Sequence, residues 1–110
     1  MNKFGNKKTV VDGITFDSKK EAKRYQELKM LERAKIIRIL MIQQVFELIP
    51  SVELNGRKTQ PMRYIADFTY FDDSKDGEFI VEDVKGFRTK EYKMKRHLMK
   101  WKHNIEVLEV

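Results

Sequence analysis

The sequence contains no cysteine among its 110 residues, and this absence excludes a disulfide scaffold and any zinc site built on thiolates. Proline and glycine are also scarce, with two and five residues respectively, and no tract has the composition of a linker. Internal repeats and low-complexity segments are absent as well. We therefore expect a single domain over residues 1–110, in which residues 1–8 form a flexible basic arm.

Long apolar runs are missing too. No stretch approaches the length of a membrane span, and the polar start of the chain lacks the apolar core of a signal peptide. Hydrophobic residues nevertheless make up 41% of the chain and charged residues 36%, which is typical of a folded protein with a heavily charged surface. We expect a cytoplasmic protein without membrane contact.

Acidic residues are nearly absent from one segment, residues 85–103, where Glu91 alone faces eight basic residues. The net charge of the whole chain is +6 and its isoelectric point is about 9.5, so the basicity belongs to this segment. Such a run can be a solvated face, but a salt-bridged surface helix would carry both signs. Contact with the phosphates of a nucleic acid is the better account. The basic residues are Lys85, Arg88, Lys90, Lys93, Lys95, Arg96, Lys100 and Lys102.

Turn and cap signals divide the chain into elements. Asp12-Gly13 predicts a tight hairpin between residues 9–11 and 14–16. Ser18 followed by Glu21 has the form of a capping box, which predicts a helix from about Lys19 to about Ala34. The buried face of this helix should carry the apolar side chains at helical spacing. These are Ala22, Tyr25, Leu28 and Leu31.

Strand signals dominate the middle of the chain. β-Branched and apolar residues from 36 to 54 indicate one bent strand or two short ones, and Asn55-Gly56 follows as a turn. Residues 63–71 and 78–85 then predict a hairpin closed by a polar loop.

The basic segment predicts a second helix from about Thr89 to about His103. Met94, Leu98 and Trp101 recur at i, i+4 and i+7 and should form its buried face. Residues 105–110 alternate as a last strand. The order β-α-β-β-β-α-β predicts an α/β or α+β fold, in which a mixed sheet of four to five strands is flanked by two helices.

Strand periodicity brings three polar side chains together. Asp83 and Lys85 share one face of their strand, whereas Glu82 points to the other. The preceding loop allows a register that sets Asp67 beside Asp83, and two adjacent carboxylates repel each other unless a cation or proton intervenes. A divalent metal with a nearby lysine is the equipment that phosphodiester hydrolysis needs. The alternatives for these residues are a surface ion pair and, for the second acid, Glu82.

The motifs Tyr64-Ile65-Ala66-Asp67 and Val81-Glu82-Asp83-Val84-Lys85-Gly86 resemble the core of the PD-(D/E)XK nuclease superfamily. The resemblance is greatest to small phage- and prophage-encoded members related to Holliday junction-resolving nucleases, and it covers nearly the whole chain. Two departures stand within the pattern. Ala66 replaces the usual proline before the first aspartate, and Asp83 replaces glutamate.

The resemblance implies a restriction-endonuclease-like core and a Mg²⁺-dependent endonuclease, with Mn²⁺ as a substitute. Asp67 and Asp83 would be catalytic metal ligands, Glu21 a further catalytic ligand, and Lys85 the motif lysine. The substrate would be duplex or branched DNA, and the protein a homodimer. The backbone-binding residues would be Arg88, Lys90, Lys93, Arg96 and Lys100.

Two alternatives remain open. Glu21 is explained equally well by its position in the capping box. The whole chain is explained by a different class, a non-catalytic nucleic-acid-binding or recombination accessory protein on the same fold, and backbone-directed chemistry leaves RNA open as a substrate.

Overall fold

The computed structural model describes residues 7–85 and 87–110. The chain forms two compact units, of which the first comprises residues 1–40 and 70–79 and the second comprises residues 41–69 and 80–110. Strands β3, β6 and β7 pass from one unit into the other. The expectation of a single domain stays a prediction. Of the predicted basic arm, residues 1–6 lie outside the described residues.

The first unit opens with the predicted hairpin. Strands β1 (Thr9–Val11) and β2 (Ile14–Phe16) pair antiparallel, with Val11 opposite Ile14. Asp12 and Gly13 both have positive φ angles, of 53° and 74°. This is the backbone that a two-residue turn of this hand requires, and it explains why the Asp-Gly pair marks the turn.

Helix α1 (Lys19–Arg33) follows in the first unit. The Ser18 hydroxyl accepts a hydrogen bond from the Glu21 backbone N–H at 3.1 Å, which satisfies one of the free donors of the first turn. Ala22, Tyr25 and Leu28 are buried, as the helical spacing predicts, whereas Leu31 is only half-buried. The rings of Phe16 and Tyr25 lie 5.0 Å apart, so the hairpin packs on the helix.

The central sheet has the strand order β3-β6-β7-β8. Its strands are β3 (Ile37–Ile49), β6 (Met62–Asp72), β7 (Glu78–Asp83) and β8 (Leu108–Glu109). The short connection between β6 and β7 forces an antiparallel pair, whereas β7 and β8 pair parallel. The fold is therefore α+β with a mixed four-stranded sheet and two helices, as expected, while the restriction-endonuclease-like core stays a prediction.

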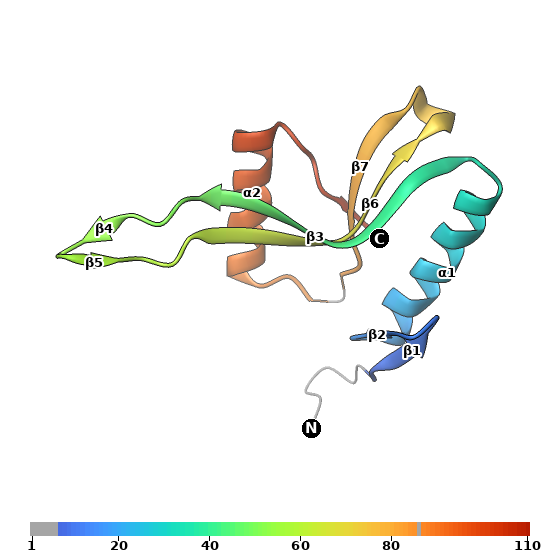
Figure 1. Cartoon of the computed structure of the whole chain (residues 1–110), viewed down its shortest axis with the longest axis horizontal. Helices are drawn as coiled ribbons and strands as arrows, with labels where there is room; N and C mark the ends of the chain where they lie inside the picture. The colour runs from blue at the N-terminus through green and yellow to red at the C-terminus, as the bar shows by residue number, and fades with distance from the viewer. Residues whose placement is uncertain (1–6, 86) are drawn as a thin grey trace. The chain divides into compact units, whose positions relative to one another are not determined.

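Strand β3 is one long strand rather than two. Ile39 and Gln43 have φ angles of 55° and 54°, which interrupt its extended backbone. Left-handed residues of this kind accompany β-bulges and bend a strand without ending it. Beyond its end, β4 (Glu53–Leu54) and β5 (Arg57–Lys58) form a narrow arm that extends away from α2 (Figure 1).

Helix α2 (Lys90–His103) belongs to the second unit. The Thr89 hydroxyl accepts from the Tyr92 N–H at 3.0 Å, and Asn104 ends the helix in the left-handed conformation. No helix in residues 7–85 and 87–110 is long and apolar enough to cross a membrane.

The predicted buried face of α2 is wrong. Met94 is 59% and Trp101 75% exposed, whereas Tyr92 and Met99 are buried. The helix carries two apolar stripes, and the sheet takes the one that begins with Tyr92 because that side chain combines an apolar ring with a hydroxyl that reaches Glu109. The predicted last strand is also shorter than residues 105–110, because only Leu108 and Glu109 pair with β7.

Candidate active site

Asp83 is the central acid of the candidate site. It ends β7 and is only 1% exposed. The Tyr64 hydroxyl donates a hydrogen bond to its Oδ2 atom, and Lys85 Nζ lies 3.6 Å from the same oxygen. The predicted strand over residues 78–85 ends at Asp83, but Lys85 still reaches the Asp83 carboxylate. Both contacts fall on Oδ2, and neither involves Oδ1.

Lys85 is held by two neighbours. Its ammonium lies between the Asp83 carboxylate and the face of the Tyr92 ring, 4.1 Å from the ring centroid. A cation over an aromatic face is stabilised by the negative charge density of that face. The side chain is 22% exposed, so the ammonium is positioned by the protein and still meets solvent.

Asp67 approaches the same motif from β6. Its Oδ2 atom accepts a hydrogen bond at 2.8 Å from the N–H of Val84, the residue between Asp83 and Lys85. Strand β7 ends at Asp83, so the Val84 N–H lies outside the strand and takes a carboxylate as its partner. Asp67 is therefore tied to the backbone of the Asp-x-Lys segment.

Both aspartates affect the pKa of the Tyr64 hydroxyl. Burial raises the pKa of Tyr64, the hydrogen bond to Asp83 raises it further, and the negative charges of both Asp83 and Asp67 add to the effect. The hydroxyl therefore stays protonated and serves as a permanent donor to Asp83. The site contains two carboxylates, one ammonium and one phenol within a single compact unit.

The rival acid Glu82 is fully buried, at 0% exposure, and alternates with Asp83 along β7. It lies opposite Leu108 in the parallel register of β7 and β8. Glu21 belongs to the first unit, where it is buried in the first turn of α1. Its role as a metal ligand stays a prediction.

The carboxylates suit one kind of metal better than another. Within the part of the chain that the structure describes, no three His, Cys, Asp or Glu side chains gather in a metal-binding group. A structural zinc ion needs such a set, whereas Mg²⁺ is commonly held by one or two carboxylates together with water and substrate phosphates. Asp67 and Asp83 fit that second donor set.

The predicted DNA contacts form two groups, one that pairs with Glu109 and one that does not. Arg88 lies 2.8 Å and Arg96 3.3 Å from the Glu109 carboxylate, and the Tyr92 hydroxyl donates to it at 2.7 Å. These partners, Arg88 first and then Tyr92, lower the pKa of Glu109 to about 2. Lys90, Lys93 and Lys100 are exposed and make no ion pair with any described residue.

Three residues of the site could not be assigned to it from the sequence. Tyr64 stands inside the quoted motif, three residues before Asp67, but nothing in its spacing assigns it a role. Tyr92 is hidden among the lysines of the basic helix. Glu109 lies opposite Asp83 in the parallel register of β8, and only that long-range pairing links it to the motif.

Comparison with known proteins assigns the chain to a family. The profile described as "Protein of unknown function (DUF1064)" matches residues 1–108, so the chain belongs to this family. No curated protein and no solved structure matches the chain significantly.

Proposed function

We propose that the chain is a Mg²⁺-dependent endonuclease of the PD-(D/E)XK type that hydrolyses DNA phosphodiester bonds. The observation that carries the proposal is the Asp83–Lys85 contact, with Asp67 hydrogen-bonded to the residue between them. Carboxylates for a cation and an ammonium for developing negative charge are the groups that this reaction needs. Mn²⁺ can substitute for Mg²⁺ in this reaction, and the active form is a homodimer.

Each side chain has a definite task. Asp67 and Asp83 would hold the metal ion, and Glu21 would be the further ligand that the resemblance implies. When bound, Mg²⁺ polarises the phosphate and lowers the pKa of a bound water. Tyr64 donates its hydroxyl hydrogen to Oδ2 of Asp83 and so holds this carboxylate in place. Lys85 supplies a positive charge beside the carboxylate, where it stabilises the charge that develops on the phosphate oxygens.

The basic helix supplies the substrate contacts. Glu109 orients Arg88 and Arg96, and Tyr92 joins this group to Lys85 because it contacts both Lys85 and Glu109. Phosphate binding by these arginines and by the exposed lysines of α2 positions the DNA backbone without reading its sequence.

A second candidate function rests on the same contact. Asp83 accepts a hydrogen bond from Tyr64 and pairs with Lys85, and an ion pair in a purely structural role makes the same contacts. A non-catalytic nucleic-acid-binding or recombination accessory protein accounts for that arrangement and for the basic helix.

Cleavage assays separate the two functions. Purified chain is incubated with plasmid, single-stranded and four-way-junction DNA, in Mg²⁺, in Mn²⁺ and in EDTA. We expect cleavage with either metal, none in EDTA, and a loss of more than about a hundredfold in Asp83→Asn. Asp73→Asn is the matched control, because Asp73 also pairs with a cation, Arg38 at 3.1 Å, but is exposed.

The outcome that contradicts the enzyme is specific. If no substrate is cut with either metal while the folded chain still binds DNA, and Asp83→Asn binds equally well, the accessory-protein function replaces the nuclease.

A further inference from the structure

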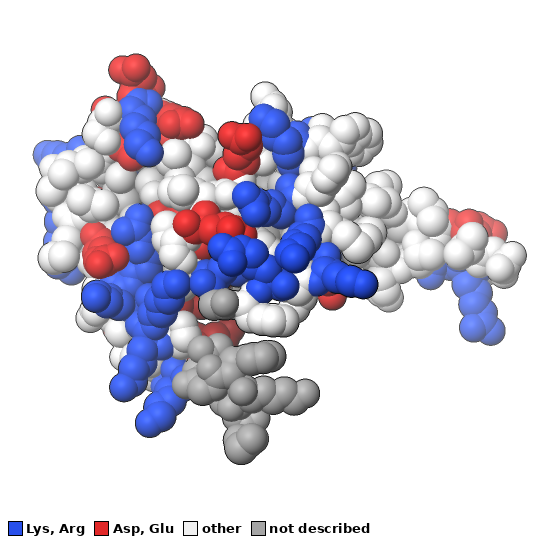
Figure 2. Space-filling view, turned by 180° about the vertical axis from the view of Figure 1, so that it is seen from behind, with Lys and Arg blue, Asp and Glu red and all other residues white. Residues whose placement is uncertain are grey.

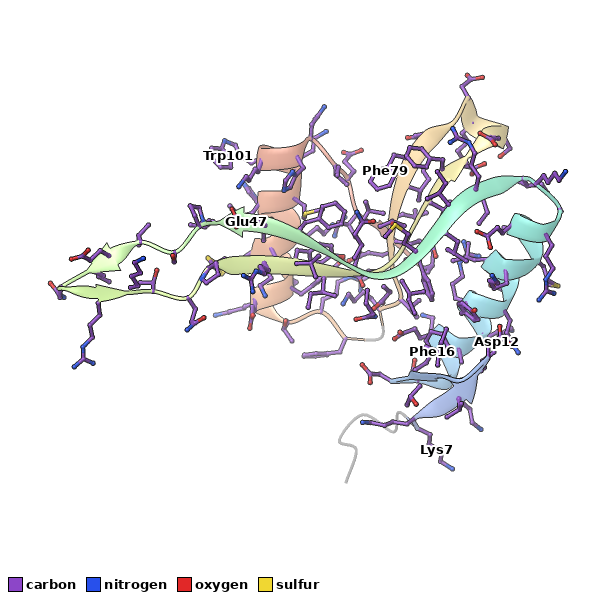
Figure 3. All side chains as sticks on the ribbon, in the orientation of Figure 1. Lys7, Asp12, Phe16, Glu47, Phe79 and Trp101 are labelled. Atoms are coloured by element: carbon purple, nitrogen blue, oxygen red, sulfur yellow. The ribbon has the colours of Figure 1, made fainter. Side chains whose placement is uncertain are left out.

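The solvent face of α2 carries apolar side chains. Met94, His97 and Trp101 follow one another at i, i+3 and i+7, so they share a face of the helix, turned away from buried Tyr92 and Met99. Trp101 is 75% exposed, and Figure 3 shows its side chain projecting outward from the end of the helix. An indole ring in water is unusual, because tryptophan is one of the largest apolar side chains and is highly buried on average.

Positive charge lines this apolar face. Lys90 stands one turn before Met94, and Lys93 and Lys100 flank the stripe on one side of the helix. All three are exposed, and Figure 2, which shows the molecule from behind, has many Lys and Arg side chains on this face. The one acid of the helix, Glu91, is held by Lys95 at 3.1 Å. The apolar face therefore has a basic border without a competing acid.

The combination of an exposed aromatic ring with neighbouring lysines indicates which kind of partner this face binds. Alternating aromatic and cationic groups bind single-stranded nucleic acid, because the aromatic ring stacks on a base while the ammonium groups contact the phosphates. In a duplex the faces of the bases are already stacked on one another, so an indole has nothing to stack on. A second copy of the chain is a poorer partner, since a two-fold interface would bring the lysines of one helix against those of the other.

We propose that Trp101 and Met94, bordered by Lys93 and Lys100, bind unpaired nucleotides of single-stranded or branched DNA. This inference rests on the proposed function for the identity of the polymer and adds the class of DNA that it acts on. Trp101 stacks on an exposed base, and the lysines hold the adjoining backbone. The helix thus favours substrates with unpaired positions over plain duplex.

Fluorescence tests the proposal directly, because Trp101 is the only tryptophan of the chain. The full chain is titrated in EDTA with a single-stranded oligothymidylate and with a blunt duplex of equal length, and the indole emission is followed. Affinities of the variants are measured in parallel by the anisotropy of a labelled oligonucleotide. We expect the single strand to quench the emission strongly and the duplex to quench it weakly.

Three variants give the expected pattern. Trp101→Ala should weaken single-strand binding by about five- to 150-fold, the loss of one stacked base, and change duplex binding by less than about twofold. Trp101→Phe should restore most of the affinity, because phenylalanine also stacks. Met30→Ala, an exposed apolar residue of α1, should leave both affinities unchanged.

Three results overturn the inference. The first is single-strand binding that is equal in wild type and Trp101→Ala. The second is an equal loss for duplex and single strand, which makes Trp101 a general support of the helix. The third is an emission that changes with protein concentration in the absence of DNA, which assigns the face to a second copy.

Failure of the nuclease function leaves a different trace. If no metal supports cleavage but the fluorescence and anisotropy results hold, catalysis is lost and single-strand binding stands. If cleavage is observed and Trp101→Ala cuts single-stranded and branched DNA with unchanged KM, binding by this face is rejected while the nuclease stands.

Discussion

Tyr64 on β6 donates its hydroxyl hydrogen to Oδ2 of Asp83, the last residue of β7. Both side chains are buried, so loss of this hydrogen bond would leave a buried polar group without a partner, which costs free energy. The contact fixes the orientation of the carboxylate, and Lys85 Nζ lies 3.6 Å from the same oxygen. It is the clearest sign that the Asp83 side chain is held in one position.

Tyr64→Phe should lower the free energy of unfolding by about 1–3 kcal/mol, because it leaves a buried carboxylate without its neutral donor. Urea denaturation measures the change. Tyr92→Phe is the control, since Glu109 keeps Arg88 and Arg96 after that substitution, and it should cost less. A Tyr64→Phe variant as stable as wild type would mean that the hydrogen bond contributes nothing to the fold.

Two substitutions of Asp67 should distinguish its structural role from the role of its negative charge. Asp67→Asn keeps an oxygen that can accept the Val84 N–H but removes the negative charge, so the variant should unfold at nearly the wild-type urea concentration and lose metal-dependent cleavage. Asp67→Ala removes both and should also be destabilised by about 1–3 kcal/mol. Cleavage by Asp67→Asn at the wild-type rate would exclude Asp67 as a ligand.

Glu21→Gln tests the ligand assigned by resemblance. The cap on this helix is formed by the Ser18 hydroxyl and the Glu21 backbone, which the substitution leaves in place. We expect the cleavage rate in Mg²⁺ to fall at least about tenfold while the free energy of unfolding changes little. Glu27→Gln on the same helix, where Glu27 pairs with Arg24, serves as the comparison. Full activity in Glu21→Gln would leave Glu21 a structural role alone.

Salt dependence should identify the lysines that meet the DNA backbone. Each phosphate contact contributes about 0.9 to the slope of log affinity against log salt concentration for duplex DNA. Lys93→Ala with Lys100→Ala should therefore reduce that slope by about 2. The pair Lys19→Ala and Lys23→Ala on α1 removes equal charge elsewhere and should change it little. Identical slopes for both double variants would mean that Lys93 and Lys100 contribute only to the overall charge and make no specific phosphate contacts.

Glu109 should make the stability of the chain depend on pH. Its folded-state pKa is lowered from 4.5 to about 2, so the stabilisation is complete above pH 4.5 and is lost as the pH falls toward 2. Because its arginine partners are exposed, we expect only about 1–2 kcal/mol from this effect. Glu109→Gln should be less stable than wild type at pH 7 and equal to it near pH 2. Parallel stability curves for the two proteins would contradict the assignment.

Several features of this fold are legible in short stretches of sequence. The Asp12-Gly13 turn and the Ser18 cap depend on the conformational preferences of a few adjacent residues, and the structure confirms them. The two-residue period of a strand predicts that Asp83 and Lys85 point the same way, and their side chains are in contact. Such features depend mainly on neighbouring residues, so they can be predicted without knowledge of distant partners.

Only the tertiary structure decided which stripe of α2 is buried. Both Tyr92 with Met99 and Met94 with Trp101 satisfy the helical period, and the choice between them depended on the sheet, which offers Glu109 to the Tyr92 hydroxyl. The same long-range pairing places Glu109 opposite Asp83 and gathers Arg88 and Arg96 around it. Sequence periodicity determined where side chains could point, and packing between distant strands determined which of them meet.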